Sequence, residues 1–218
     1  MTLVVGARCR DGIVLAADRR RLSRYERGPE TSKLFKLACG VALAGAGDDA
    51  VLNEARFFIG HRIMEFQSEP AEITLHDVVE ITASVVNELV GYYKEKVEEP
   101  FGYVLAGLDK LDSGNAKLYT IFGAGFSDVP WACLGSGSSY ARPLVELLLA
   151  DGNLSVEEAT KTIAPLFTLV SNVQTTVGGG IDICVAKDNQ GLGAIVYESQ
   201  VDLSRLRTAI LNSIGVKS

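Results

Sequence analysis

The chain has 218 residues, of which 47% are hydrophobic and 22% are charged. This length and composition suit a folded protein with a substantial core and exclude an intrinsically disordered chain. The net charge of −6 and the isoelectric point near 5.0 argue against a nucleic-acid-binding protein, which would present a basic face. No apolar run approaches the roughly 18 residues of a membrane-spanning helix, so we expect no membrane partner.

Cysteine usage and the N-terminus favour a cytoplasmic protein. The cysteines form no CxxC pair and lie in apolar stretches, as buried free thiols in a reducing compartment do: Cys9, Cys39, Cys133 and Cys184. His61 and His76 are far from any cysteine in the sequence, so we expect no zinc site and no other metal or cofactor. The opening residues MTLVVGARCRDG lack a basic leader ahead of an apolar stretch, which argues against a signal peptide.

The N-terminal quarter is predicted to contain four strands and a loop. Thr2–Ala7 and Ile13–Ala17 are predicted to be strands joined at Asp11-Gly12, a dipeptide typical of tight hairpins. The polar segment Arg19–Ser32 contains a Gly-Pro pair and is predicted to be a loop. Two further strands are expected on either side of Cys39-Gly40: Lys33–Leu37 and Val41–Gly45.

Helical periodicity then predicts two helices, Asp48–Gln67 and Leu75–Val97. One aspartate of the Asp48-Asp49 pair is expected to cap the first helix, and Thr74 with Asp77 resembles a capping box before the second. The apolar face of the first helix is expected to comprise Val51, Leu52, Ala55, Phe58, Ile59 and Ile63. That of the second is expected to comprise Val78, Val79, Ile81, Val85, Leu89 and Val90.

The rest of the chain repeats this order of strands and paired helices. Strands are predicted at Gly102–Leu108, Lys117–Ile121 and Val129–Leu134. A helix over Ser139–Ala150 follows, and Ser155 with Glu158 is expected to cap another that ends near Ser171. The closing elements are predicted to be two strands and a short helix: Ile181–Val185, Gly193–Tyr197 and Leu203–Leu211.

Strands, two helices, strands, two helices and strands indicate an α+β protein in which helices cover two stacked sheets. A simple βαβ alternation is absent from the pattern. No Pro/Ser-rich linker divides the chain, so we expect a single domain over residues 1–218.

Thr2, Asp18 and Lys33 are each of a kind that is usually structural when it occurs alone. Their combination with other motifs is more specific. In chain order these are Thr2-Leu-Val-Val-Gly6, then Asp11-Gly-Ile-Val-Leu-Ala-Ala-Asp18-Arg19-Arg20, Ser32-Lys33-Leu34-Phe35, Ala44-Gly45 ahead of Gly47-Asp48-Asp49-Ala50, Leu134-Gly135-Ser136-Gly137-Ser138 and Gly178-Gly179-Gly180-Ile181-Asp182. This series resembles the β subunits of the proteasome family over nearly the whole chain, in order and in spacing.

The resemblance implies a four-layer αββα sandwich, two antiparallel sheets flanked by helix pairs, which is the fold of N-terminal-nucleophile hydrolases. It also implies a threonine-type endopeptidase. The chain lacks the extra N-terminal helix and leader of α subunits, which is why the resemblance is to the β type.

The chemistry of the candidate residues agrees with that activity. Removal of Met1 would leave the α-amine of Thr2 tethered to its hydroxyl, and such an amine titrates at roughly 7.7–8.0, where it can act as the base. A cation from Lys33 would stabilise the developing alkoxide, and Asp18 would hold Lys33 charged and oriented.

The resemblance assigns further roles to residues of the same motifs. It implies that the backbone N–H of Gly45 stabilises the oxyanion and that the Ser136 hydroxyl binds the threonine amine. The substrate pocket is expected to have Leu43 at its base. The other residues expected to line or flank the pocket are Arg21, Thr31, Phe35 and Gly47; they suggest tolerance of an apolar side chain, and Arg21 would favour an acidic neighbour.

The sequence departs from the family pattern before the late glycines. Gln174 stands where the family has an aspartate, and Val177 stands where it has a serine. Thr176 could replace the serine hydroxyl only with a shift of one residue. A neutral glutamine cannot provide the charge of a carboxylate, so the amine is expected to be less well tuned as a base.

Three functions therefore remain open. The leading one is a peptidase that degrades unfolded polypeptides inside a homo-oligomeric ring of six or seven subunits, with an α-type ring and an ATPase unfoldase as partners. The second is a structural homologue with an idle site, which Gln174 and Val177 favour. The third is an acyl transferase or a small-molecule amidase that uses the same threonine.

Overall fold

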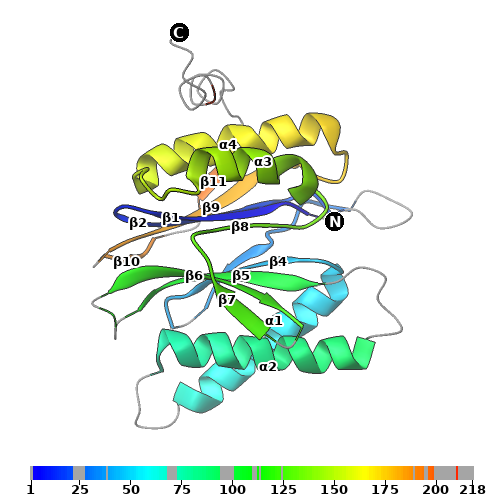
Figure 1. Cartoon of the computed structure of the whole chain (residues 1–218). Coiled ribbons are helices and arrows are strands. Elements are labelled where there is room, and N and C mark those ends of the chain that lie inside the picture. The colour runs from blue at the N-terminus through cyan, green and yellow to red at the C-terminus, as the bar shows by residue number, and fades with distance from the viewer. Residues whose placement is uncertain are drawn as a thin grey trace.

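The chain folds into four layers. The computed structural model describes residues 2–21, 28–37, 39–67, 73–93, 101–109, 112, 114–123, 125–188, 190–193, 196–198 and 210. Helices α3 (Ser138–Leu149) and α4 (Val156–Val173) cover one sheet, and helices α1 (Asp49–Gln67) and α2 (Leu75–Tyr93) cover the other (Figure 1). The predicted α+β, four-layer αββα sandwich is confirmed.

Both sheets are antiparallel throughout the described residues. The first contains β1 (Val4–Cys9), β2 (Gly12–Asp18) and β8 (Trp131–Leu134), together with β9 (Ile181–Lys187), β10 (Gly191–Leu192) and β11 (Val196–Glu198). The second has the order β3 (Leu34–Lys36), β4 (Ala42–Ala46), β5 (Gly102–Asp109), β6 (Asn115–Phe122) and β7 (Gly125–Asp128). Strand β1 lies between β2 and β8, so the segment that carries Thr2 enters the interior of its sheet.

Alternation along the strands fills the three interfaces between the layers. In β1, Val4 belongs to the cluster between the two sheets, whereas Val5 belongs to the cluster beneath α3 and α4. In β2, Leu15 and Ala17 face the other sheet and Ala16 faces the helices. Successive side chains of a strand point to opposite faces, so a strand packed on both sides is apolar at every position.

The predicted helix caps are present. The Thr74 backbone N–H donates to Asp77 Oδ2 at 2.7 Å, and the Asp77 N–H donates to Thr74 Oγ1 at 3.1 Å. Ser155 and Glu158 form the same reciprocal pair before α4. For α1 the structure selects Asp48 from the two candidates, because its Oδ1 accepts from the backbone N–H of Ala50 at 2.8 Å.

Several predicted boundaries are wrong. The strand expected over Val129–Leu134 begins at Trp131, and it is preceded by β7, whose four exposed residues lack the apolar alternation that would have predicted it. The strand expected over Gly193–Tyr197 is Val196–Glu198 instead. Phe58 was expected on the buried face of α1 but is 42% exposed. Residues 94–97 of the second predicted helix, and the helix predicted over Leu203–Leu211 apart from Ile210, lie outside the described residues.

The described cysteines are free thiols, of which Cys133 and Cys184 are buried. Burial raises the pKa of Cys9 and of Cys133 to about 12 and that of Cys184 to about 11, so these groups stay protonated at neutral pH. Within the described part of the chain, no helix is both long enough and apolar enough to cross a membrane.

Replacing Thr74 with alanine should lower the free energy of unfolding by about 1 kcal/mol, because the first turn of α2 loses its side-chain acceptor. Urea denaturation followed by circular dichroism measures the change. The matched control is Asn87→Ala on an exposed position of the same helix, which should change stability by less than about 0.5 kcal/mol. Equal effects of the two substitutions would show that the cap does not stabilise α2.

Candidate active site

The turn between β8 and α3 binds the backbone of Thr2. The Gly137 N–H donates to the Thr2 carbonyl at 3.1 Å, and the Thr2 N–H donates to Ser136 Oγ at 3.2 Å. Gly135 has a φ of +92°, and a Cβ there would lie 2.2 Å from the Thr2 carbonyl oxygen. A side chain at position 135 would therefore push Thr2 away from Ser136. Thr2 itself is fully buried.

The Asp18 carboxylate accepts hydrogen bonds from four segments of the described chain. Its Oδ1 accepts from the Leu3 backbone N–H at 2.9 Å and from Lys33 Nζ at 2.9 Å. Its Oδ2 accepts from the backbone N–H groups of Arg20 at 3.2 Å and Gly178 at 3.1 Å. The Lys33 ammonium and the amide of the residue that follows Thr2 are thus separated by a single oxygen atom.

Burial has the largest influence on the pKa of the Asp18 carboxyl. Asp18 is fully buried and the Lys33 side chain is 5% exposed. Burial raises the pKa of the Asp18 carboxyl above its usual value, and the Lys33 charge and the N–H groups of Leu3 and Gly178 oppose that rise. A buried charge is tolerated only when it is paired and hydrogen-bonded, and here each charge satisfies that requirement for the other.

The Gly178–Gly180 turn contains one of the donors to Asp18, the Gly178 N–H. All three glycines have positive φ angles, of 138°, 76° and 88°. The Arg20 backbone N–H donates to the Gly178 carbonyl at 2.7 Å, and a Cβ at Gly178 would lie 2.6 Å from the Arg20 guanidinium. Only glycine allows this close approach. The sequence motif alone does not reveal this contact with Asp18.

Ser136 connects Thr2 to the segment in which the sequence departs from the family. Its hydroxyl lies 2.8 Å from Thr176 Oγ1, and the Gln174 side-chain amide donates to its backbone carbonyl at 3.2 Å. Val177 is fully buried in the apolar cluster beneath α3 and α4. The second hydroxyl next to Ser136 is therefore supplied by Thr176, one residue before the family's serine position. Arg20 fixes this segment by donating from Nη1 to the Thr175 carbonyl at 2.7 Å.

The expected oxyanion donor is engaged in this conformation. The Gly45 N–H donates to the Lys33 carbonyl at 3.2 Å, as part of the pairing of β4 with the start of β3. A Cβ at Gly45 would lie 2.8 Å from Leu52 and 2.8 Å from Tyr103, so a glycine is also required there by packing. An oxyanion would have to share this N–H with the carbonyl or displace the carbonyl from it.

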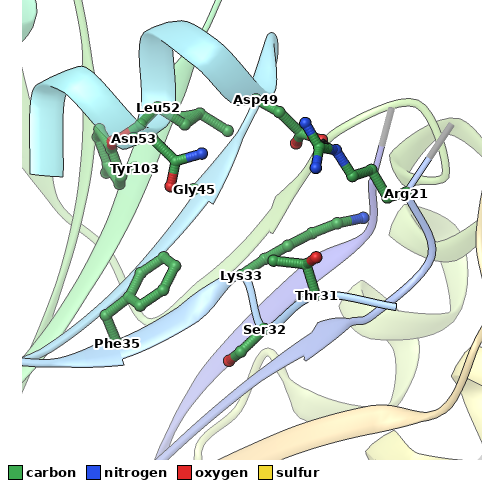
Figure 2. Close-up of a pocket in the computed structure, with 10 residues that line it drawn as sticks. All are labelled: Arg21, Thr31, Ser32, Lys33, Phe35, Gly45, Asp49, Leu52, Asn53 and Tyr103. Atoms are coloured by element: carbon green, nitrogen blue, oxygen red, sulfur yellow. Dashed lines mark hydrogen bonds and ion pairs between the residues drawn. The ribbon is translucent and has the colours of Figure 1, made fainter. Parts of the chain in front are cut away.

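A pocket opens beside Lys33 and Gly45. It has about 380 Å³ of empty space, part of it open to solvent. Arg21, Thr31 and Phe35, three of the residues expected at a substrate pocket, line it (Figure 2). The remaining lining residues were not predicted: Ser32, Asp49, Leu52, Asn53 and Tyr103. Four of these come from α1 and β5, and a sequence motif carries no information about which distant strand a helix will face.

Two residues expected at the pocket are not among those that line it. Leu43 is fully buried, because it pairs with Phe35 and Leu105 in the sheet and is covered by the helix layer. Gly47 has a φ of +138°, and a Cβ there would lie 2.4 Å from Phe101 Cβ, so it serves the turn into α1. The charge of Arg21, which was expected to favour an acidic group, is matched by Asp49 at 3.0 Å.

Substitution Asp18→Asn should lower the free energy of unfolding by about 3–5 kcal/mol, because it leaves the Lys33 ammonium buried without a counter-charge. The double variant Asp18→Asn/Lys33→Met should be more stable than the sum of the two single effects by at least about 1 kcal/mol. Chemical denaturation of the four proteins measures this coupling.

The control for that cycle is Glu88→Gln, which breaks an exposed ion pair with Arg62 and should cost less than about 1 kcal/mol. Additive effects of the substitutions at positions 18 and 33 would contradict the view that the two charges depend on each other.

Comparison with known proteins matches residues 2–186 to the proteasome family, described as "Proteasome subunit". A proteasome subunit alpha from Methanococcus maripaludis is 26% identical over 203 residues, 92% of this chain and 74% of the relative. A proteasome subunit beta 1 from Thermococcus onnurineus is 26% identical over 186 residues, 84% and 86% of the two chains. Among solved structures, an Anbu mutant from Hyphomicrobium sp. strain MC1 shares the fold, with a TM-score of 0.77, 18% identity and coverage of 99% and 95%. The chain belongs to the proteasome subunit family.

Proposed function

We propose that the chain is a β-type threonine peptidase whose nucleophile is Thr2 after removal of Met1. The observation that carries this proposal is the single Asp18 oxygen that accepts from both Lys33 Nζ and the Leu3 N–H. It fixes a buried ammonium beside the backbone of the residue that follows Thr2. The bond from the Thr2 nitrogen to Ser136 Oγ supports the same assignment, because that nitrogen is the base in the proposed mechanism.

In the proposed reaction the Thr2 hydroxyl gives its proton to its own α-amine as Oγ1 attacks the carbonyl carbon of a peptide bond. The Lys33 charge stabilises the alkoxide, and it disfavours a positive charge on the nearby amine, which keeps the base neutral. Collapse of the tetrahedral intermediate breaks the C–N bond, and the leaving amine takes the proton. Water then hydrolyses the Thr2 ester, and the N-terminal part of the substrate leaves with a new carboxylic acid at its end.

Oxyanion stabilisation by Gly45 requires a local adjustment. Its N–H donates to the Lys33 carbonyl, so a bound substrate must compete for that donor. An extended peptide laid beside β4 could do this by taking over the backbone pairing at this point. Loss of one such donor typically costs about 2.7–4 kcal/mol of transition-state stabilisation.

The second candidate is a ring-forming homologue without hydrolytic activity. Gln174 favours it, because this residue presents an amide to the Ser136 carbonyl where the family pattern has a carboxylate. Thr176 opposes it, because its hydroxyl restores a polar partner for Ser136 Oγ. The two candidates differ in whether Thr2 forms a covalent ester.

We further propose that the chain works in the cytoplasm as a homo-oligomeric ring that acts on unfolded polypeptides, with an α-type ring and an ATPase unfoldase as partners. The relatives named alpha and beta proteasome subunits support an assembly. So do large apolar side chains on the outer faces of the helices, which are 59–67% exposed: Phe57, Met64, Tyr92 and Val173.

Incubation with a peptide epoxyketone should add one inhibitor mass to a protein that lacks Met1, because this reagent needs both the hydroxyl and the free amine of an N-terminal threonine. Intact mass spectrometry measures the adduct, and Thr2→Ala is the control that should stay unlabelled. Absence of an adduct on protein that lacks Met1 would contradict the peptidase proposal and favour the structural homologue.

Thr176→Val should lower kcat/KM for a fluorogenic peptide by about tenfold, because Ser136 loses the hydroxyl that orients it toward the amine. Thr175→Val is the matched control, since this neighbouring side chain is exposed, and it should leave the rate unchanged. An unaltered rate in Thr176→Val would show that Thr176 takes no part in the proposed mechanism.

Gln174→Asp should shift the acidic limb of the pH–rate profile to higher pH, because a nearby carboxylate raises the pKa of the Thr2 amine.

A further inference from the structure

An ion pair joins the two sides of the pocket. Arg21 Nε lies 3.0 Å from Asp49 Oδ2. Arg21 follows the end of β2, whereas Asp49 begins α1, and Figure 2 shows their side chains pointing toward each other at one end of the pocket. The side chains are 48% and 29% exposed, so both charges remain accessible to a ligand.

Among the described residues, the rest of the pocket wall presents no unbalanced charge. Lys33, the other lining residue with a charge, is paired with Asp18. Phe35, Leu52 and Tyr103 contribute apolar surface, and the Tyr103 hydroxyl donates to the Leu52 carbonyl at 2.7 Å inside the protein. Each charged side chain of the lining therefore has an opposite partner. A wall of this kind favours an uncharged side chain, because a charged one would be desolvated without compensation.

We propose that Asp49 determines the charge preference of this site by cancelling the positive charge of Arg21. The pocket then accepts an uncharged side chain at the residue before the scissile bond, and it disfavours glutamate, aspartate, lysine and arginine. This inference rests on the proposed peptidase function and assigns its substrate class. Without Asp49, the Arg21 guanidinium would face the pocket as an unpaired cation and would attract a carboxylate.

Asp49 can be changed without removing the helix cap. The side chain that caps α1 belongs to Asp48, whose Oδ1 accepts from Ala50 N–H. The Arg21–Asp49 pair is partly exposed, and pairs of that kind contribute little to stability. Asp49→Asn should therefore fold, and its effect on cleavage should report the charge of the pocket.

The test uses two fluorogenic peptides that differ only in glutamine or glutamate before the scissile bond. The ratio of kcat/KM for the glutamate peptide to that for the glutamine peptide cancels effects common to both substrates. In Asp49→Asn this ratio should rise about tenfold relative to the wild type. In Arg21→Gln it should fall, because Asp49 then faces the pocket alone. The double variant should return toward the wild-type ratio.

Glu65→Gln, a change of the same chemical kind far along α1, is the matched control and should leave the ratio unchanged. The same ratio can be measured from labelling rates with two epoxyketones that carry glutamine or glutamate at this position, which needs no turnover. If Asp49→Asn and Arg21→Gln both keep the wild-type ratio while the wild type cleaves or is labelled, the charge assignment is overturned and the peptidase proposal stands. If wild-type protein that lacks Met1 neither cleaves nor is labelled, both proposals fail.

Discussion

The buried carboxylate of Asp18 is the constraint on which the rest of the site depends. It binds the backbone beside Thr2, the Lys33 ammonium and two further N–H groups at once. A buried charge in this position is stable only when all of these donors bind it. The carboxylate therefore fixes β1, the start of β3 and the Gly178 turn relative to one another. The same contacts of Asp18 therefore stabilise this part of the sandwich and position the candidate nucleophile.

Glycines allow the backbone to approach closely enough for these contacts. A Cβ at Gly135 would lie 2.2 Å from the Thr2 carbonyl oxygen, and a Cβ at Gly178 would lie 2.6 Å from the Arg20 guanidinium. Each of these glycines has a positive φ angle, so any side chain would be strained there as well as obstructed. A family motif rich in glycine thus reflects the crowding of polar backbone groups around one carboxylate and one threonine.

Neutral groups and balanced charges characterise the remainder of the site. Gln174 and Thr176 surround Ser136 with an amide and a hydroxyl, without the carboxylate of the family pattern. In the pocket, Asp49 balances Arg21. The proposed mechanism therefore assigns to Lys33 the charge that acts on its base. Substrate selection is correspondingly expected to follow shape and polarity more than charge.

The helices, most of the strands, their layering over two sheets and the helix caps could be predicted from the sequence, because apolar periodicity and capping chemistry are local properties of a chain. The grouping of Thr2, Asp18 and Lys33 was predicted from the resemblance of the motif series to proteasome β subunits. The sequence did not reveal the exposed strand β7, the burial of Leu43 or the pairing of Arg21 with Asp49. These features depend on which strand or helix packs against a residue distant in the chain, and no local pattern in the sequence encodes that neighbour.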